Sequence, residues 1–182
     1  MNVVPGHNHV QRLHRPRGFT LVELVVVMAI IGILGAIGAA RYFDRRGFDS
    51  AGFAEQARAM LRFSQKLAIG QNRPIFTQLN GSTVALCFAN TSPCPVADQV
   101  PAVGGVADCT PNTWYCLAPP RTIAYTVSPA SASTVCFTAL GQPGVAAGAT
   151  CNAVAFAGAT INITGDGATT PVNVAAETGY VF

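Results

Sequence analysis

Residues 19–40 constrain this chain more than any other stretch, because they form an apolar run that contains one carboxylate, Glu23. About 20 apolar residues suffice for a helix to cross a bilayer, so the run predicts a membrane-spanning helix. Glu23 inside that helix costs about 3 kcal/mol on insertion scales, and we therefore expect it to have a partner and a role. Gly32, Gly35 and Gly38 recur at intervals of three. They form either a strip that admits a neighbouring helix or an ordinary set of tolerated membrane glycines.

Residues 1–18 precede this run as a polar, basic leader that ends at Gly18. The whole chain has 11 Lys and Arg residues and 8 Asp and Glu residues, and three of the cations lie in the leader. The positive-inside rule therefore places the leader in the cytoplasm and the residues after position 40 across the membrane. The leader also holds all 3 histidines, so a chain without it has balanced charge and no imidazole. This composition argues against an enzyme, a bound cofactor and a His-ligated metal site.

An ordinary secretory signal peptide, cut near Gly38-Ala39-Ala40, is the alternative interpretation of this N-terminus. The small residues at that place fit such a cut. The Glu23 carboxylate does not fit, and the apolar run is longer than the roughly 7–15 residues of a secretory core. We therefore favour a helix that stays attached to the chain.

Residues 41–73 are predicted to continue as an amphipathic helix. Gly47 and Gly52 each weaken a helix by roughly 1 kcal/mol relative to alanine, which predicts a bend or break over residues 47–52. The helix is expected to end between residues 70 and 74, because Pro74 disfavours a helical conformation at Arg73. Spacings of three and four give this helix one apolar or small face, formed by Phe53, Ala57, Met60, Leu61, Ser64, Leu67 and Ala68.

Residues 74–182 are predicted to form a β-rich head. Asn80-Gly81, between residues 75–79 and 83–88, is a strong hairpin signal. The Ala- and Gly-rich residues 144–150 are expected to form a loose loop. The expected fold class is α+β, with a long N-terminal hydrophobic helix, transmembrane in its first half, packed on a small antiparallel β-sheet head. Further short strands are expected at residues 113–117, 122–127, 135–139, 153–156, 160–164, 172–175 and 179–182.

The six cysteines all lie beyond the apolar run. An even number in an exported domain indicates disulfides, and the spacings do not fit the short Cys-x2–4-Cys pattern of zinc sites. The strand candidates that carry Cys87 and Cys116 can lie side by side around a Pro-rich loop. Six cysteines allow about 15 pairings, so other connectivities stay open. The expected pairing nests Cys94–Cys109 inside Cys87–Cys116, with Cys136–Cys151 separate.

The stretch Arg17-Gly18-Phe19-Thr20-Leu21-Val22-Glu23-Leu24 resembles the class III signal of type IV pilins and type II secretion pseudopilins. The resemblance implies that a membrane prepilin peptidase cuts between Gly18 and Phe19 and methylates the new N-terminus at Phe19. It also implies the pilin-like arrangement of a long helix on a small β head.

Three details favour a minor subunit within this resemblance. Residues 61–69 are similar to the helix end of H-type minor pilins and pseudopilins. Residues 176–181 are similar to the C-terminal end of the MSHA C-type minor pilin. Many major pilins have a proline near the end of the membrane segment, where this chain has Ala39-Ala40-Arg41.

The resemblance implies a structural subunit that enters or initiates a type IV pilus filament, with a minor pseudopilin of a type II secretion system as an alternative. Its partners would be prepilin peptidase, the inner membrane and other pilin or pseudopilin subunits. It would be a single-pass inner-membrane protein with a periplasmic head before assembly, and part of a pilus or pseudopilus of a Gram-negative bacterium afterwards. Glu23 would pair with the amine of a neighbouring subunit's Phe19. A DNA-binding minor pilin is a further alternative, but Arg121 is the only basic residue after Pro74, which argues against a nucleic-acid partner.

Overall fold

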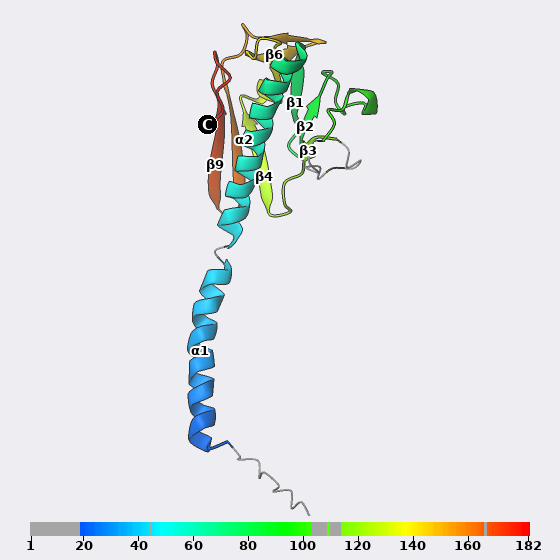
Figure 1. Cartoon of the computed structure of the whole chain (residues 1–182). Coiled ribbons are helices and arrows are strands. Elements are labelled where there is room, and N and C mark those ends of the chain that lie inside the picture. Colours follow the sequence, from blue (N-terminus) through cyan, green and yellow to red (C-terminus); the bar gives the residue numbers. More distant parts are fainter. Residues whose placement is uncertain (1–18, 44, 103–108, 110–113, 166) are drawn as a thin grey trace, which may run out of the picture. The chain divides into compact units, whose positions relative to one another are not determined.

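The computed structural model describes residues 19–43, 45–102, 109, 114–165 and 167–182, and among these it gives the backbone alone for residues 39–43 and 45–48 (Figure 1). The chain divides into two compact units, Met1–Tyr42 and Phe43–Phe182. The first unit contains helix α1 (Leu21–Phe43) except for the last residue of the helix, Phe43. The second unit, called the head below, holds helix α2 (Arg45–Gln71) and the β-strands.

The predicted helix break over residues 47–52 is wrong, because α2 is helical from Arg45 to Gln71. Position 44, between the two helices, lies outside the described residues. A Cβ at Gly52 would meet nothing within 4 Å, so this glycine costs only the roughly 1 kcal/mol of lower helix propensity. The adjacent Phe53 and Ala54 are buried, and the burial of their apolar surface offsets that cost.

The end of α2 lies where the sequence predicts it. Asn72 follows the helix with a φ of 50°, a left-handed conformation that asparagine tolerates better than most residues. The Asn72 N–H donates to the Ile69 carbonyl at 3.2 Å, and the Arg73 N–H donates to the Ala68 carbonyl at 3.2 Å. This pair of hydrogen bonds is the Schellman motif, which satisfies carbonyls that a helix end otherwise leaves unpaired.

The strands form two antiparallel sheets under α2, which confirms the predicted α+β class. The larger sheet has six strands in the order β3-β2-β1-β5-β6-β7, and the smaller has three in the order β4-β8-β9. The bounds are Ile75–Leu79 (β1), Val84–Cys87 (β2), Cys116–Leu117 (β3), Ile123–Ser128 (β4), Thr134–Phe137 (β5), Pro143–Ala147 (β6), Thr150–Asn152 (β7), Ala159–Gly165 (β8) and Ala168–Val174 (β9).

The predicted hairpin at Asn80-Gly81 is confirmed. β1 and β2 pair from Phe76↔Cys87 to Leu79↔Val84. Gly81 has a φ of 84°, which glycine adopts without steric cost. The side-chain oxygen of Asn80 accepts hydrogen bonds from the Ser82 and Thr83 N–H groups at 2.9 and 2.7 Å, so the turn carries its own support.

In the second half of the head, the strands predicted at residues 122–127, 135–139, 160–164 and 172–175 are confirmed as β4, β5, β8 and β9, but three other predictions are wrong. Residues 144–150 do not form a loose loop, because β6 and β7 make a hairpin there, with Val145 opposite Asn152. Residues 153–156 contain no strand, and residues 179–182 contribute only an isolated bridge between Val174 and Val181. Alanine and glycine have low strand propensity, but pairing of β6 with β5 decides the conformation.

The core of the head lies between α2 and both sheets. α2 contacts β1 and β5 of the larger sheet and β8 and β9 of the smaller one (Figure 1). The predicted helix face is buried, except that Leu67 is only partly buried. Ser64 on this face donates to the Leu61 carbonyl at 2.7 Å and accepts from the Thr77 hydroxyl of β1 at 3.2 Å, so its polar group is satisfied.

Tyr125 of β4 connects the smaller sheet to the β1–β2 turn. Its hydroxyl accepts a hydrogen bond from the Gly81 N–H at 3.0 Å and donates one to the Thr83 carbonyl. Burial raises the pKa of Tyr125 to about 12, while the Gly81 hydrogen bond acts in the opposite direction. The neutral phenol is therefore the form that the folded head holds.

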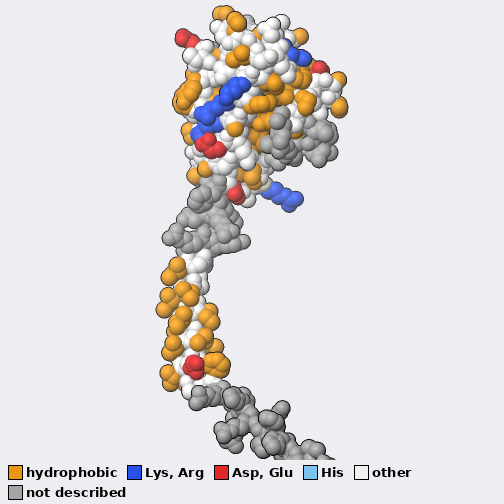
Figure 2. Space-filling model, viewed as in Figure 1, with side chains coloured by type: hydrophobic (Ala, Val, Ile, Leu, Met, Phe, Trp, Pro, Cys, Tyr) orange, Lys and Arg blue, Asp and Glu red, His pale blue; other side chains and the backbone are white. Residues whose placement is uncertain are grey.

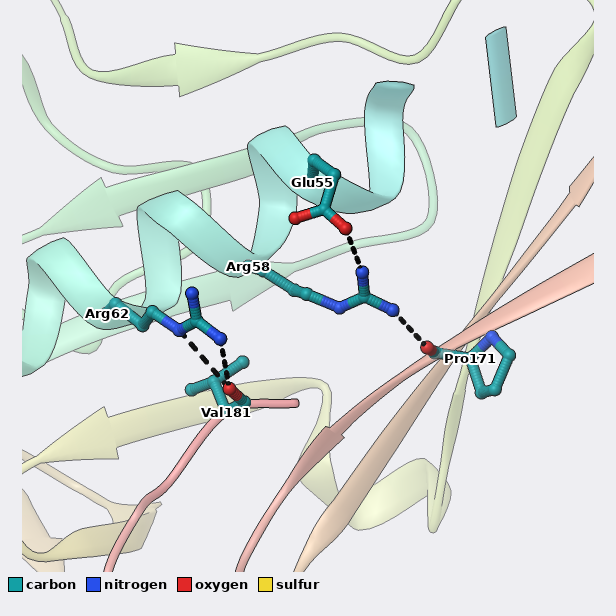
Figure 3. Close-up of polar contacts among 5 residues, drawn as sticks. All are labelled: Glu55, Arg58, Arg62, Pro171 and Val181. Atoms are coloured by element: carbon teal, nitrogen blue, oxygen red, sulfur yellow. Dashed lines mark hydrogen bonds and ion pairs between the residues drawn. The ribbon is translucent and has the colours of Figure 1, made fainter. Parts of the chain in front are cut away.

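Two arginines on α2 hold β9 and the C-terminal residues through main-chain oxygens (Figure 3). Arg58 Nη2 donates to the Pro171 carbonyl at 3.0 Å, and its Nη1 pairs with Glu55. Arg62 donates twice to the Val181 carbonyl, from Nη2 at 2.7 Å and from Nε at 3.2 Å. Hydrogen bonds from charged donors are stronger than neutral ones, so these contacts fasten the C-terminal residues to the helix.

Gln65 adds a third contact, one helical turn beyond Arg62. Its Nε2 donates to the carbonyls of Gly141 at 2.8 Å and Thr178 at 2.9 Å. Gly179 has a φ of 66°, and a Cβ there would lie 2.9 Å from Phe137 and 3.0 Å from Gln65 Nε2. Three segments distant in sequence therefore meet at one amide group.

All six cysteines are paired, but two of the expected pairs are wrong. The disulfides are Cys87–Cys94, Cys109–Cys116 and Cys136–Cys151, so only the last matches the expectation. The strands that carry Cys87 and Cys116 are neighbours, as expected. Their register places Cys116 opposite Ala85 rather than Cys87, and Cys87 instead lies opposite Phe76 of β1. The first two disulfides are therefore local, each joining residues 7 positions apart.

Candidate functional site

The candidate site is the start of α1, where the sequence predicts cleavage and assembly. Phe19 is 77% exposed and lies just before the helix. The Thr20 hydroxyl accepts a hydrogen bond from the Glu23 N–H at 3.2 Å, and the Thr20 carbonyl accepts one from the Leu24 N–H at 3.1 Å. Thr20 is thus the N-cap of α1, with Glu23 as its third residue. Gly18 lies outside the described residues.

This geometry gives Glu23 a local reason for its place, which sequence reasoning missed. Thr-x-x-Glu is the capping-box pattern, in which the N-cap hydroxyl accepts a hydrogen bond from the N–H of the glutamate. A carboxylate in the first turn is also favoured by the positive end of the helix dipole. The signal was readable in residues 20–23, directly before an apolar run.

The body of α1 is apolar on every side and exposed within the chain. The window Leu21–Gly38 has a mean hydropathy of 2.6, and none of it is buried. Figure 2 shows hydrophobic side chains along this helix, with one acidic side chain near its start. Its 23 residues are about 34 Å long at 1.5 Å per residue, which exceeds the roughly 30 Å hydrocarbon core of a bilayer. By length and composition α1 is able to span a membrane.

The small-residue strip predicted on α1 is open. A Cβ added at Gly32, Gly35 or Gly38 would meet no atom within 4 Å. The chain itself therefore gives these glycines no packing role, and both predicted explanations, close helix approach and simple tolerance, stay open.

Within the described part of the head, the basic side chains are mostly engaged. Figure 2 shows Lys and Arg side chains over α2. Arg58 and Arg62 donate to main-chain oxygens, and the Arg73 guanidinium lies 4.1 Å from the centre of the Phe88 ring. Among the described residues, no group of three His, Cys, Asp or Glu side chains is placed to hold a metal ion.

Comparison with known families identifies this N-terminus. Residues 13–39 match the family profile of the prokaryotic N-terminal methylation motif. The chain carries a prepilin-type methylation motif. The match covers Gly18, Phe19 and Glu23, and it confirms the resemblance to prepilins that the sequence predicts.

Two crystal structures of the type IV minor pilin FimU from Pseudomonas aeruginosa are similar to this prepilin-type chain. Both are 18% identical to it and cover 71% of it. The chain covers 83% of one and 87% of the other, with TM-scores of 0.48 and 0.47. No curated protein sequence matches the chain.

Proposed function

We propose that the chain is a minor pilin-like structural subunit rather than an enzyme. Prepilin peptidase cuts between Gly18 and Phe19 and methylates Phe19, and α1 then holds the subunit in the inner membrane with the head in the periplasm. The observation that carries the proposal is the methylation motif that leads directly into an exposed, apolar helix. A helix apolar on all sides needs lipid or other helices around it. Other pilin-like subunits are the partners that would replace lipid after assembly.

Intact-mass analysis of the membrane-extracted protein tests the processing step. We expect a chain that begins at methylated Phe19 and retains α1. A control in a strain without prepilin peptidase should show the uncut chain. A mature chain that begins near Arg41 would establish an ordinary signal peptide and overturn the proposal.

Glu23 is proposed to act in assembly. Phe19 and Glu23 are four residues apart, so cleavage creates an amine one helical turn from the carboxylate. Between subunits, away from water, attraction between the carboxylate of one chain and the Phe19 amine of its neighbour is stronger than in solvent. The pair would select one helix register, because a carboxylate without its partner is costly in an apolar core.

The Glu23→Val variant tests this role. We expect normal membrane insertion and cleavage, because the change removes a charge from an apolar helix, and loss of most filament incorporation. The measurement is the amount of subunit in sheared filaments from a strain without the wild-type copy. The control is Thr20→Ala, which removes the cap hydroxyl but leaves the carboxylate. Wild-type incorporation of Glu23→Val would refute the role.

Assembly in a type IV pilus and in a type II secretion pseudopilus are two versions of this proposal. Mass spectrometry of sheared surface filaments separates them, because only pilus assembly places the subunit there. The DNA-binding alternative ranks lower, since Arg58 and Arg62 of α2 donate to main-chain oxygens of the head and Arg121 is the only basic residue after Pro74. A gel shift at low salt that weakens steeply as salt is raised would reverse that ranking.

A further inference from the structure

The three-stranded sheet has a solvent-facing side without any ionisable residue. α2 covers the other side, where Ile161, Ile163 and Val172 are fully buried. The residues between them in sequence point away from α2, because side chains alternate along a strand, and all of them are exposed or half-buried. This neutral face consists of Ala124, Thr126 and Ser128 of β4, Thr160, Asn162 and Thr164 of β8, and Thr169, Pro171 and Asn173 of β9.

Hydroxyl and amide groups cover this neutral face in register. Ser128, Thr160 and Asn173 lie opposite one another across the three strands. The Thr160 hydroxyl donates to the Asn173 side-chain oxygen at 2.9 Å, and the Asn173 amide nitrogen has no partner among the described residues. Hydroxyls and amides both donate and accept hydrogen bonds. The face therefore suits a ligand whose own groups also do both.

A groove lined on one side by Phe182 adjoins one end of the neutral face. It has a volume of about 380 Å³, and its lining includes Ser128, Thr160, Asn173 and Phe182. Phe182 stacks on Tyr180, with ring centres 5.8 Å apart and planes 17° apart, yet these residues are 52% and 62% exposed. Exposed aromatic rings beside a concave surface are typical of ligand sites.

The aromatic pair is held in place from two sides. The Phe182 N–H donates to the Asn173 carbonyl at 3.0 Å, and the Asn173 N–H donates to the Phe182 carbonyl at 2.8 Å. Val181 lies between Tyr180 and Phe182 in sequence, and its carbonyl accepts both hydrogen bonds from Arg62. A ligand therefore meets a preformed aromatic surface, which lowers the entropic cost of binding.

We propose that the neutral face and its groove bind a neutral oligosaccharide. The C–H side of a sugar ring packs on an aromatic ring, and its hydroxyls match the hydroxyl and amide groups of the face. No lining side chain of the groove is ionisable, so no side chain there can pair with the charges of a polyanion or a charged peptide. The inference does not depend on the proposed function.

The edge of β9 argues against a peptide that adds a strand. Asn173 uses both its N–H and its carbonyl on Phe182. Pro171 has no N–H, and its carbonyl accepts from Arg58. Strand addition, the usual way in which a sheet edge takes a peptide, therefore lacks free main-chain groups at Pro171 and Asn173, the part of the edge next to the groove.

The test uses the full chain in a detergent without a sugar head group, such as lauryldimethylamine oxide. The probes are neutral hexasaccharides of glucose, mannose or N-acetylglucosamine, with a galacturonic acid hexasaccharide and a proline-rich peptide as comparators. Isothermal titration calorimetry gives the affinity, and saturation-transfer NMR identifies the sugar protons in contact. We expect one neutral series to bind, and Tyr180→Ala and Asn173→Ala to weaken it about tenfold.

Leu140→Ala is the matched control, because Leu140 is 82% exposed on the β5–β6 turn and should leave the affinity unchanged. Methyl-labelled threonines in the wild-type chain give a readout that needs no substitution. Sugar-induced shifts at Thr126, Thr160 and Thr169 would support the proposal. Binding of no neutral sugar, binding of the acidic sugar or the peptide alone, or shifts confined to other threonines would overturn it.

Discussion

The two long helices of this chain have opposite relations to their surroundings. The large apolar side chains of α1 from Leu21 to Ile37 are 42–79% exposed, whereas Met60 and Leu61 of α2 are 0% exposed. The apolar surface of α2 is covered by the chain's own sheets. That of α1 is not covered by any described part of the chain. The comparison indicates that the head is stable through its own core, while α1 depends on a medium that the chain does not supply.

The largest expected difference between the two helices is in how the substitution of one leucine changes the free energy of unfolding. Leu61→Ala leaves a cavity in the core and should lower the free energy of unfolding of the head by about 2–5 kcal/mol. Leu24→Ala, at a position that is 53% exposed, should change it by less than about 0.5 kcal/mol. Urea unfolding of the full chain in detergent, followed by Trp114 fluorescence, measures both. Equal losses would show that α1 and the head unfold as one unit.

Substitution of one glycine in the head and one in α1 should show the same difference in stability with a smaller magnitude. A Cβ at Gly144 of β6 would lie 2.7 Å from Cys151 Sγ and 2.8 Å from the Asn152 carbonyl oxygen, whereas one at Gly35 meets nothing within 4 Å. Gly144→Ala should therefore destabilise the head by about 1–3 kcal/mol, because backbone and disulfide have to shift. Gly35→Ala should leave the head unchanged. Thermal unfolding followed by near-ultraviolet circular dichroism checks both. Unchanged stability of Gly144→Ala would show that the β6–β7 hairpin accommodates the added Cβ without cost.

The third expected effect is a loss of head stability at high pH. Tyr125 has a pKa of about 12 in the folded head against 10.0 for an unperturbed tyrosine, so the folded state binds the phenol proton more tightly. Its contribution is fully present below pH 10 and is lost as the pH rises through about 12. Tyr125→Phe should flatten this decline, with a residual slope from Tyr115, whose pKa burial also raises. Unfolding free energies measured from pH 10 to 12 test it, and identical slopes for both chains would exclude Tyr125 as the cause.

The parts of the fold that the sequence predicts are those with a local physical cause. Asn80-Gly81 predicts its hairpin because the turn residues meet their own conformational and hydrogen-bonding needs. The buried face of α2 follows from helical spacing alone. At the candidate site, the sequence points to Glu23 because a charge in an apolar run requires an explanation, while the Thr20 cap was missed although its pattern was present.

The parts that the sequence does not predict depend on pairing between distant segments. The β6–β7 hairpin has weak strand propensity, and it forms because β5 offers an edge to β6. The disulfide partners of Cys87 and Cys116 depend on the register between β2 and β3. Cys116 lies opposite Ala85, and a shift of two residues would place it opposite Cys87. Gly47 and Gly52 lower the local helix propensity, but burial of Phe53 outweighs this cost, so the predicted break does not occur. In each case a non-local contact decides between conformations that local preference leaves close in energy.

The contacts of Arg58, Arg62 and Gln65 affect which residues of this chain can be substituted during evolution. All three donate to main-chain oxygens, which every residue type carries. The helix therefore recognises the path of the C-terminal backbone and not the identity of its exposed side chains. Substitutions at the exposed Thr178 leave such a contact intact, whereas loss of a donor on α2 releases the segment whatever its sequence. An alignment of relatives should accordingly show conserved donors on the helix and little covariation with the exposed residues that they hold.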